Sequence, residues 1–349
     1  MAAQTPSPSH DELSQRFERF ARRECHVSPL YERLSVGIAD DPEVLGIAAQ
    51  AKPGQPLPNL FLAAVHFLLL RGIPAPLAAF YPSLSPTTAW SADPYPSFRV
   101  FCLEHREEIL GLISTRLVQT NEVRRCGCLL PAFTHVAQQA EGRPLALVEI
   151  GASAGLNLLW DRYGYDYGVG QCYGDPRSPV RIVCEVRGTR RPPLPAMWPR
   201  VATRVGLDLH PIDVRDSDAA LWLRALVWPD EVGRAKLLQE AMWVAQDHPP
   251  RLLAGNALDL LPEVLATIPS DHIPCVFHTH TLNQFPLEAR ARLSALLTEH
   301  AIGQDLYRVS IEWLGKMDPR LELIAYREGV TAEHSLAYCG SHGEWLKWF

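Results

Sequence analysis

The sequence predicts an α/β protein, in which an all-α N-terminal domain precedes a doubly wound, mostly parallel sheet with a C-terminal antiparallel hairpin. Three observations predict this fold. Helical patterns separated by prolines occupy the first 140 residues, where no alternating strand pattern occurs. From Pro144 onward, short apolar runs alternate with helical patterns, as in parallel sheets with crossover helices. The last two strand patterns have only a short link, which favours antiparallel pairing. We therefore expect domains at 1–140 and 141–349.

Capping residues and prolines predict the helices of the first domain. A serine, aspartate or asparagine precedes most of the helical patterns, twice followed by a proline suited to the first helical position. A glycine ends the most apolar helix. The expected helices are Ser9–Arg22, one starting at Ser28-Pro29, one starting at Asp41-Pro42, Asn59–Gly72, Ser97–Leu117 and Asn121–Gln139.

Apolar runs bounded by turn residues predict the strands of the second domain. The five expected parallel strands are Leu145–Ile150, Val201–Leu207, Arg251–Ala254, Ile273–Phe277 and Leu306–Trp313. Between them lie the expected helices Asp218–Ala225, Glu231–Ala245, Leu258–Ala266 and Pro286–Glu299. The closing hairpin consists of Leu321–Tyr326 and Ser335–Cys339.

The chain between the first two strands is longer than a single crossover needs. Asp208, at the end of the second strand, lies 57 residues after Gly151, whereas about 20 residues suffice in a simple strand–helix–strand unit. Three alternating tyrosines and a further strand pattern, separated by glycine turns, occupy the extra length. We expect an inserted β-hairpin at about residues 163–199, which either borders the ligand site or only elaborates the surface.

Composition excludes several classes of function. The chain has 349 residues, 33 Lys+Arg, 39 Asp+Glu and a formal charge of −6, so it lacks the basic excess of a nucleic-acid-binding protein. The longest apolar run, Leu60–Leu70, has 11 residues against the roughly 20 of a membrane span. No signal-peptide pattern occurs at the N-terminus. The eight cysteines include no C-x-x-C pair, so we expect reduced thiols, a cytoplasmic location and no metal site. The oligomeric state stays open.

Residues that follow the strands form the candidate ligand site, because ligands of open parallel sheets bind beyond the carboxyl ends of strands. The first strand ends in a turn that allows close approach of backbone to a ligand, and an acid precedes it. An aspartate suited to ribose hydroxyls ends the second strand, and an asparagine suited to an adenine edge ends the third. The expected cofactor-binding residues are Glu149, Gly151, Ser153, Gly155, Asn157, Asp208, Asn256, Ala257 and Thr279.

Two histidines at the end of the fourth strand are the candidate catalytic residues. His278 and His280 are two positions apart and face the same side if the strand continues past His278. A neutral imidazole can take a proton from a hydroxyl or amine nucleophile. A metal pair and a buried structural histidine are the alternatives. His280 is the preferred base.

A polar cluster at a helix junction is the candidate substrate site. It consists of Arg116, Gln119, Asn121, Glu122 and Arg125, and the tyrosine at the start of the insert, Tyr163, joins it. A capped junction is the structural alternative, in which Thr120 or Asn121 caps the next helix and Glu122 stabilises its first turn. The two interpretations are compatible, because a capped junction also presents its neighbours to a ligand.

The second half of the chain, from about Pro144 to Phe349, resembles Rossmann-type S-adenosylmethionine-dependent methyltransferases. Their motif acid-x-Gly-x-Gly-x-Gly corresponds to Glu149-x-Gly151-x-Ser153-x-Gly155, with serine replacing the middle glycine. The stretch Val276–Leu282 resembles the segment that lines the transferred methyl group. The resemblance implies a Rossmann-like fold, S-adenosylmethionine as cofactor and a small-molecule substrate.

The whole chain also resembles an uncharacterised bacterial family known as domain of unknown function 2332. The stretches that carry this resemblance are Thr115–Arg125, Glu149–Leu158, Asp161–Tyr167 and Val227–Pro229. It supplies no substrate.

Other functions stay open on the sequence alone. A non-catalytic protein could hold the cofactor or a nucleotide on the same fold. A nicotinamide-dependent oxidoreductase fits less well, because of the 57-residue gap and the closing hairpin. A serine hydrolase is a further alternative, because Gly151-Ala-Ser153-Ala-Gly155 matches the nucleophile-elbow pattern, with Asp259 and His280 or His334 in the right chain order.

Overall fold

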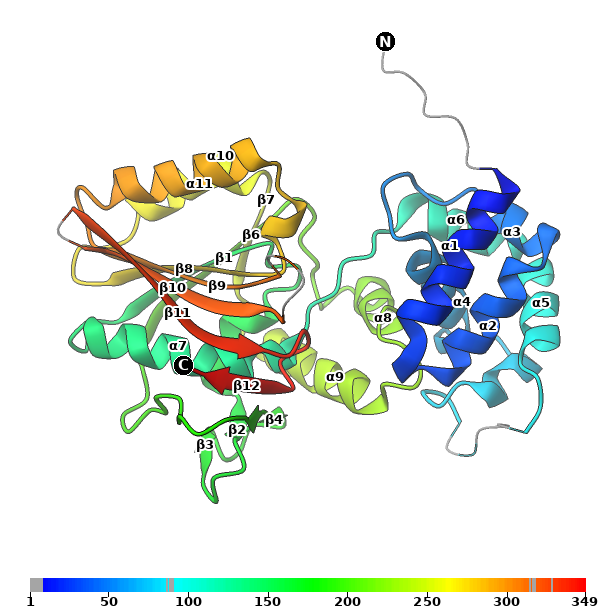
Figure 1. The fold of residues 1–349 in the computed structure, drawn as a ribbon, viewed down its shortest axis with the longest axis horizontal. Coiled ribbons are helices and arrows are strands. Elements are labelled where there is room, and N and C mark those ends of the chain that lie inside the picture. The colour runs from blue at the N-terminus through cyan, green and yellow to red at the C-terminus, as the bar shows by residue number, and fades with distance from the viewer. Residues whose placement is uncertain (1–8, 86, 88–90, 314, 316–317, 328) are drawn as a thin grey trace, which may run out of the picture. The chain divides into compact units, whose positions relative to one another are not determined.

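The computed structural model describes residues 9–85, 87, 91–313, 315, 318–327 and 329–349. Residues 1–8, which belong to the N-terminal stretch without a signal-peptide pattern, lie outside the described residues. The chain divides into two compact units (Figure 1). Residues 1–120 and 216–236 form the helical unit, and residues 121–215 and 237–349 form the sheet unit. Within the described residues, no helix has the length and apolarity needed to cross a bilayer.

The helical unit contains the expected capped helices. Ser9, Ser28 and Asp41 each accept a backbone N–H at a helix start, as predicted. The unit's helices are α1 His10–Arg23, α2 Pro29–Ala39, α3 Pro42–Ala48, α4 Leu57–Leu70, α5 Tyr95–Glu104, α6 Arg106–Thr115 and α8 Ser217–Ala225, with short 3-10 turns at Cys25–Val27 and Pro76–Phe80.

Two helix predictions were wrong in detail. The single helix expected from Ser97 to Leu117 is interrupted at His105, whose φ of −108° and ψ of 29° are not helical. The His105 ring packs on Phe101 at a centroid distance of 4.5 Å. Asn59 lies inside α4 rather than before it, where its side chain accepts a hydrogen bond from Trp228 Nε1 at 3.2 Å.

A buried histidine makes the helical unit sensitive to acid. His66 in α4 is 2% exposed, and its Nδ1 and Nε2 lie 3.1 Å from the Ala225 carbonyl oxygen and 2.8 Å from Ser83 Oγ. Burial lowers the pKa of His66 to about 4. The neutral ring therefore fits the folded state, and protonation opposes folding.

Replacing His66 by glutamine is expected to remove part of the pH dependence of stability. Because the folded pKa lies below the ordinary 6.5, the free energy of unfolding falls as pH drops from 6.5 to about 4, by up to roughly 3 kcal/mol. Urea unfolding at several pH values should reveal this fall in the wild type and not in the variant. Parallel pH profiles for the two proteins would contradict the assignment.

The sheet unit is built on a nine-stranded, mostly parallel sheet with the order β5-β12-β11-β10-β9-β8-β1-β6-β7. Strands β7, β6, β1, β8 and β9 are parallel, as expected, and β10 and β11 form the expected antiparallel hairpin. The strands are β1 Leu145–Ile150, β5 Glu185–Val186, β6 Val201–Asp208, β7 Arg251–Ala254, β8 Ile273–Thr279, β9 Leu306–Glu312, β10 Arg320–Arg327, β11 Val330–Cys339 and β12 Trp345–Trp348.

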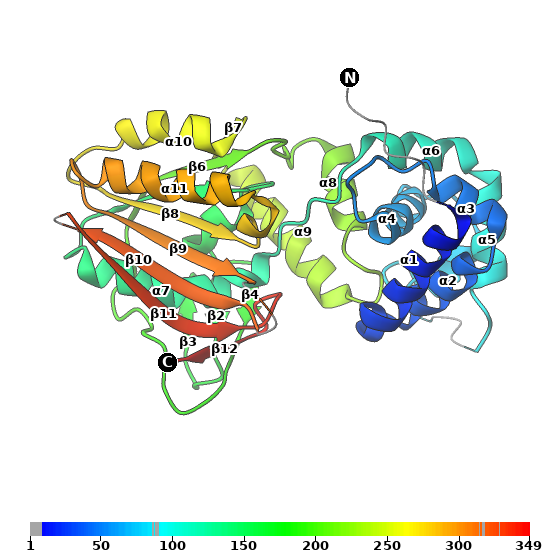
Figure 2. The ribbon, with the colours of Figure 1, turned by 45° about the horizontal axis from the view of Figure 1, so that its top comes forward.

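Helices cover both faces of this sheet (Figures 1 and 2). Helices α10 Ala257–Ala266 and α11 Leu287–His300 pack on one face, where Val148, Val205 and Leu261 belong to the same buried core. Helix α7 Cys126–Gln139 packs on the other face against β9 and β10. The sequence boundary at residue 140 had grouped α7 with the N-terminal helices. Helix α9, Val232–Asp247, spans the point where the chain enters the sheet unit for the second time.

The insert after β1 has more strands than the single hairpin expected. β2 Gly164–Asp166 and β3 Cys172–Gly174 pair antiparallel, and β4 Arg181–Val183 pairs parallel to β2 in a separate three-stranded sheet. β5 then joins the edge of the large sheet by pairing with β12.

Candidate functional site

The strand order reverses at β1, which places the site at the carboxyl ends of β1, β6 and β8. β6 and β7 follow β1 on one side, whereas β8 and β9 lie on the other. β1 and β8 are neighbours, and the chain that leaves them continues toward opposite sides of the sheet. Ligands of parallel sheets bind at such a reversal.

The loop after β1 contains three left-handed residues in alternation. Gly151, Ser153 and Gly155 have φ values of 73°, 54° and 70°. A Cβ at Gly151 would lie 2.5 Å from Thr281 Oγ1, and one at Gly155 would lie 2.8 Å from Pro250 Cγ. Glycine is thus required at both positions by backbone conformation and by close packing of the protein itself.

Ser153 adopts the conformation that glycine favours and has a buried hydroxyl. The residue is 2% exposed, and its Oγ has no hydrogen-bond partner within the described residues. Its N–H donates to Asp208 Oδ2 at 2.8 Å, and Asp208 Oδ1 accepts from the N–H of His210 at 2.9 Å. Asp208 therefore ties the loop after β1 to the end of β6.

Replacing Ser153 by glycine is expected to stabilise the chain by about 0.5–1 kcal/mol. The left-handed conformation is unfavourable for a residue with a Cβ, and the change also removes an unpaired buried hydroxyl. Chemical denaturation measures the difference. Ser153→Ala keeps the Cβ at positive φ and should therefore gain less stability. An equal gain for both variants would contradict a cost of the Cβ at this position.

Glu149 is a buried acid with one unpaired oxygen. It is 1% exposed, and its Oε1 accepts from Asn157 Nδ2 at 3.3 Å, whereas Oε2 has no hydrogen-bond partner in the described part of the chain. Cys126 Sγ donates to Asn157 Oδ1 at 3.3 Å. Burial raises the pKa of Glu149 well above its ordinary value, and the nearby Asp208 adds to this, whereas Arg125 opposes it. Asn157 holds Glu149 in place.

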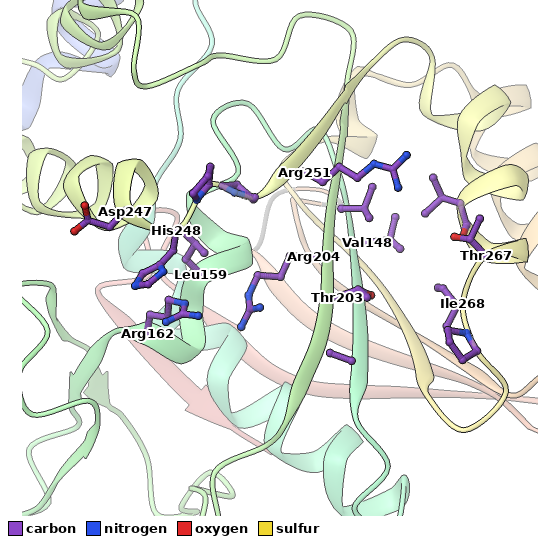
Figure 3. A pocket seen from close by; sticks show the side chains of 16 residues that line it. Val148, Leu159, Arg162, Thr203, Arg204, Asp247, His248, Arg251, Thr267 and Ile268 are labelled. Carbon is purple, nitrogen blue, oxygen red and sulfur yellow. The ribbon is translucent and has the colours of Figure 1, made fainter.

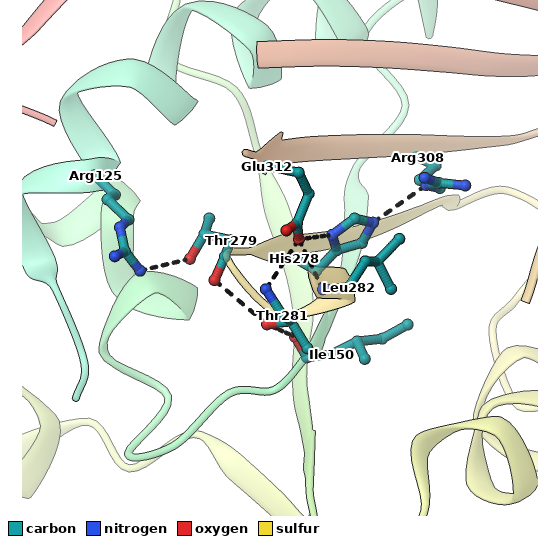
Figure 4. Close-up of polar contacts among 8 residues, drawn as sticks. All are labelled: Arg125, Ile150, His278, Thr279, Thr281, Leu282, Arg308 and Glu312. Atoms are coloured by element: carbon teal, nitrogen blue, oxygen red, sulfur yellow. Dashed lines mark hydrogen bonds and ion pairs between the residues drawn. The ribbon is translucent and has the colours of Figure 1, made fainter. Parts of the chain in front are cut away.

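His278 is held on both ring nitrogens (Figure 4). Its Nδ1 lies 2.7 Å from Glu312 Oε1, and its Nε2 accepts a hydrogen bond from Arg308 Nε at 3.2 Å. Because Arg308 is a donor, His278 Nδ1 carries the proton that Glu312 accepts. The ring is fully buried, and burial lowers its pKa. This environment favours a positioning role over proton transfer.

Glu312 organises the loop after β8. Its Oε1 also accepts the N–H groups of Thr281 at 3.0 Å and Leu282 at 3.1 Å. Burial alone would raise the pKa of Glu312, but these hydrogen bonds and the one from His278 lower it. Glu312 was not among the predicted site residues, although it lies at the carboxyl end of β9, where the strand-end rule would have selected it.

His280 has a free ring nitrogen, unlike His278. Its φ is 53°, and its Nε2 is buried without a hydrogen-bond partner among the described residues. Burial, and next the charge of Arg125, lower the pKa of His280 to about 4. Arg125 donates to Thr279 Oγ1 at 3.3 Å and to the Ser341 carbonyl oxygen at 3.2 Å. His280 is therefore neutral at pH 7.

Three of the expected substrate residues are engaged in structural contacts of the sheet unit. Asn121 Oδ1 accepts the N–H of Leu156 at 3.0 Å, and the Glu122 carboxylate caps the N–H of Arg124. Tyr163 is fully buried and donates to the Leu156 carbonyl oxygen at 2.7 Å. Glu122, rather than Asn121, is therefore the residue that caps the turn at Val123–Arg125, and Asn121 instead holds the loop after β1.

Two of the expected substrate residues, Arg116 and Gln119, belong to the helical unit. There Arg116 pairs with Asp218 and lies over the Phe67 and Trp222 rings.

At the end of β7, Asn256 caps the following helix. Its Oδ1 accepts the N–H of Leu258 at 3.0 Å, and Ala257 is the first helical residue of α10. The side chain of Asn256 is exposed at the carboxyl edge. Capping does not occupy its amide nitrogen.

The residues of the alternative hydrolase triad are not hydrogen-bonded to one another within the described residues. Neither Ser153 Oγ nor His280 Nε2 has a hydrogen-bond partner, Asp259 pairs with Arg292 at 2.8 Å, and His334 lies within β11.

One protein family matches the chain. The family described as "Uncharacterized protein conserved in bacteria (DUF2332)" covers residues 14–348. No curated protein matches the sequence.

Proposed function

The chain belongs to this uncharacterised bacterial family, and we propose that it is an S-adenosylmethionine-dependent methyltransferase with a Rossmann-like sheet, acting on a small molecule. One observation carries the proposal. The left-handed loop after β1 is joined to Asp208 at the point where the parallel strand order reverses. Dinucleotides and related cofactors bind at this point in doubly wound sheets.

Unpaired buried atoms at this edge support a ligand site. Buried polar atoms are nearly always hydrogen-bonded in native proteins, and each exception needs an explanation. Three such exceptions are Glu149 Oε2 near the end of β1, Ser153 Oγ on the loop after β1 and His280 Nε2 on the loop after β8. A polar ligand would supply the missing partners.

Different residues of the site suit different chemical groups of the cofactor. Asp208 has acceptor oxygens at the end of β6, suited to the ribose hydroxyls, and Glu149 has a carboxyl oxygen suited to a cationic group. The departure from the glycine motif is compatible with this role, because Ser153 adopts the left-handed conformation itself. Asn256 at the end of β7 has an exposed amide suited to the adenine edge.

The bound cofactor supplies an electrophilic methyl group on sulfur, and the protein positions the acceptor. The His280 ring is neutral at pH 7, and with its proton on Nδ1 its Nε2 accepts the proton of a hydroxyl or amine as that group attacks. Arg125 fixes Thr279 beside it. Glu312 and His278 hold the end of β8 and the loop after it, which carry Thr279 and His280. Orientation of the nucleophile accounts for most of the rate enhancement in such a reaction.

Thermal unfolding with S-adenosylmethionine, S-adenosylhomocysteine, NAD and ATP tests the cofactor. Only the two sulfur nucleotides should raise the midpoint, by a few degrees at about 100 times the dissociation constant. Formation of S-adenosylhomocysteine with any acceptor separates a methyltransferase from a non-catalytic binding protein. A rise with NAD or ATP alone, or no rise with any ligand, would overturn the proposal.

A further inference from the structure

A cavity of about 550 Å³ lies at the amino ends of β6 and β7, at the opposite edge of the sheet from the candidate site (Figure 3). β6 pairs with β7 only from Val205 to Asp208, so residues 201–204 pair with β1 alone. The cavity follows this open edge onto both faces of the sheet. At about 3.3 Å per residue, Thr203 lies roughly 16 Å along β6 from Asp208. A ligand in this cavity is therefore distinct from one at the carboxyl edge.

The face opposite α10 is cationic. Arg204 donates to the Leu158 carbonyl oxygen at 3.1 Å and pairs with Asp161. Arg162 and Arg204 extend toward one another in Figure 3, with His248 beside Arg162. The only acid of the cavity lining, Asp247, is exposed, and its side chain points away from them.

Unpaired buried atoms lie beside this cationic part of the cavity. Arg162 Nε and Asp161 Oδ1 are buried, and neither has a hydrogen-bond partner among the described residues. The Asp161 carboxylate pairs with Arg204, and no ion pair of Arg162 occurs among the described residues. A buried guanidinium N–H needs an acceptor, and an oxyanion suits the planar donor fork of arginine. One more negative charge would balance the two arginines.

The face toward α10 is mostly apolar. Val148, Val205, Val264 and Ile268 line it, together with the hydroxyl-bearing Thr203 and Thr267. Arg251 pairs with Val205 and therefore lies on this face, at the exposed end. The cavity is thus polar and cationic at one end and apolar at the other, in the size range of small-molecule sites.

We propose that this cavity binds an amphipathic organic anion, with its carboxylate or phosphate on Arg162 and Arg204 and its apolar body against Val148, Val264 and Ile268. The site lies outside the proposed methyl-transfer site and does not depend on it. The ligand supplies acceptor oxygens to the guanidinium groups of Arg162 and Arg204 and covers apolar surface beside the open edge of β6.

Thermal unfolding of the full chain with model anions tests this site. The probes are 4-phenylbutyrate and phenyl phosphate at millimolar concentration, with 4-phenylbutanol as the uncharged counterpart and sodium chloride at matched ionic strength. At least one anion should raise the midpoint by about 2–4 °C, and the alcohol should raise it less. Comparison of the two anions identifies a carboxylate or a phosphate as the preferred group.

Variants separate this site from general anion effects. Arg162→Gln should abolish the rise, whereas Arg177→Gln, at a side chain that is 91% exposed on the insert, should keep it. Asp208→Asn should also keep it, because Asp208 lies at the other edge. An equal rise in the wild type and in Arg162→Gln, an equal rise with the alcohol, or no rise with either anion would overturn the proposal.

Discussion

Replacing Glu149 by glutamine is expected to stabilise the ligand-free protein and to weaken S-adenosylmethionine binding at the same time. The change keeps an acceptor for Asn157 Nδ2 and removes a buried ionisable group. We expect a gain of about 0.5–2 kcal/mol at pH 8, because functional sites commonly carry stability costs of this size. Binding should weaken by about tenfold, the effect of losing one hydrogen bond to a charged group.

The sign of the pH dependence follows from the direction of the pKa shift. Because the pKa of Glu149 is raised in the folded state, the native protein binds more protons than the unfolded chain above the ordinary pKa of 4.5. The free energy of unfolding of the wild type therefore falls as pH rises above that value. The glutamine variant lacks this fall, so its advantage should grow from pH 5 to pH 8.

Urea unfolding and calorimetric titration measure the two effects. Glu185→Gln provides the matched control, because Glu185 is exposed and pairs only with Arg187 in the contacts of the described chain. It should change neither stability nor affinity by a measurable amount. A glutamine variant of Glu149 that is less stable than the wild type at pH 8, or that binds the cofactor equally well, would contradict the role assigned to this acid.

Replacing Glu312 by alanine is expected to lower the free energy of unfolding by about 3–5 kcal/mol. The carboxylate accepts hydrogen bonds from His278 Nδ1 and from the N–H groups of Thr281 and Leu282, and it is 3% exposed. Removing it leaves three donors without an acceptor, two of them buried and one partly buried, and such a loss belongs to the costliest class of single substitution.

Glu312→Gln separates the hydrogen bonds from the packing. Its amide oxygen can accept the same three bonds, so we expect a loss of only about 1 kcal/mol in urea unfolding. The alanine variant should also bind S-adenosylmethionine more weakly, because Thr281 packs directly on Gly151. Equal losses of stability for the two variants would show that the hydrogen bonds of Glu312 contribute little.

Local patterns account for most of the fold that could be predicted. The alternation of apolar runs and helical patterns located all five parallel strands, because each contains a short apolar run followed by a turn. The strands β5 and β12 were missed. β5 has two residues, and its pairing partner lies about 160 residues away in the chain, so no local pattern marks it.

The helix interruption at His105 illustrates a second limit. Neither proline nor glycine marks the break, and the residues on both sides have helical patterns. Contacts formed only in the folded unit, such as the His105 ring on Phe101, accompany it. Tertiary packing overrides local helix propensity in such cases.

The position of a candidate side chain at the carboxyl edge was predictable where the side chain ends or directly follows a strand. This rule selected Asp208 and His280, and the acid before the first glycine, Glu149, lies near the end of β1. It could not distinguish His278 from His280, because only the folded structure shows that both nitrogens of His278 are occupied. The junction residues Asn121 and Glu122 also needed the structure, since their contacts are with distant or local backbone N–H groups.

Calorimetric titration of S-adenosylhomocysteine into the wild type, Asp208→Asn and Asp213→Asn tests the central claim most directly. Asp208 contacts the loop after β1, whereas Asp213 is exposed and pairs with Arg215. We predict that Asp208→Asn weakens binding by at least about tenfold, whereas Asp213→Asn binds like the wild type. Equal affinity in all three proteins, or no binding to the wild type, would contradict a cofactor site at the carboxyl edge of the sheet.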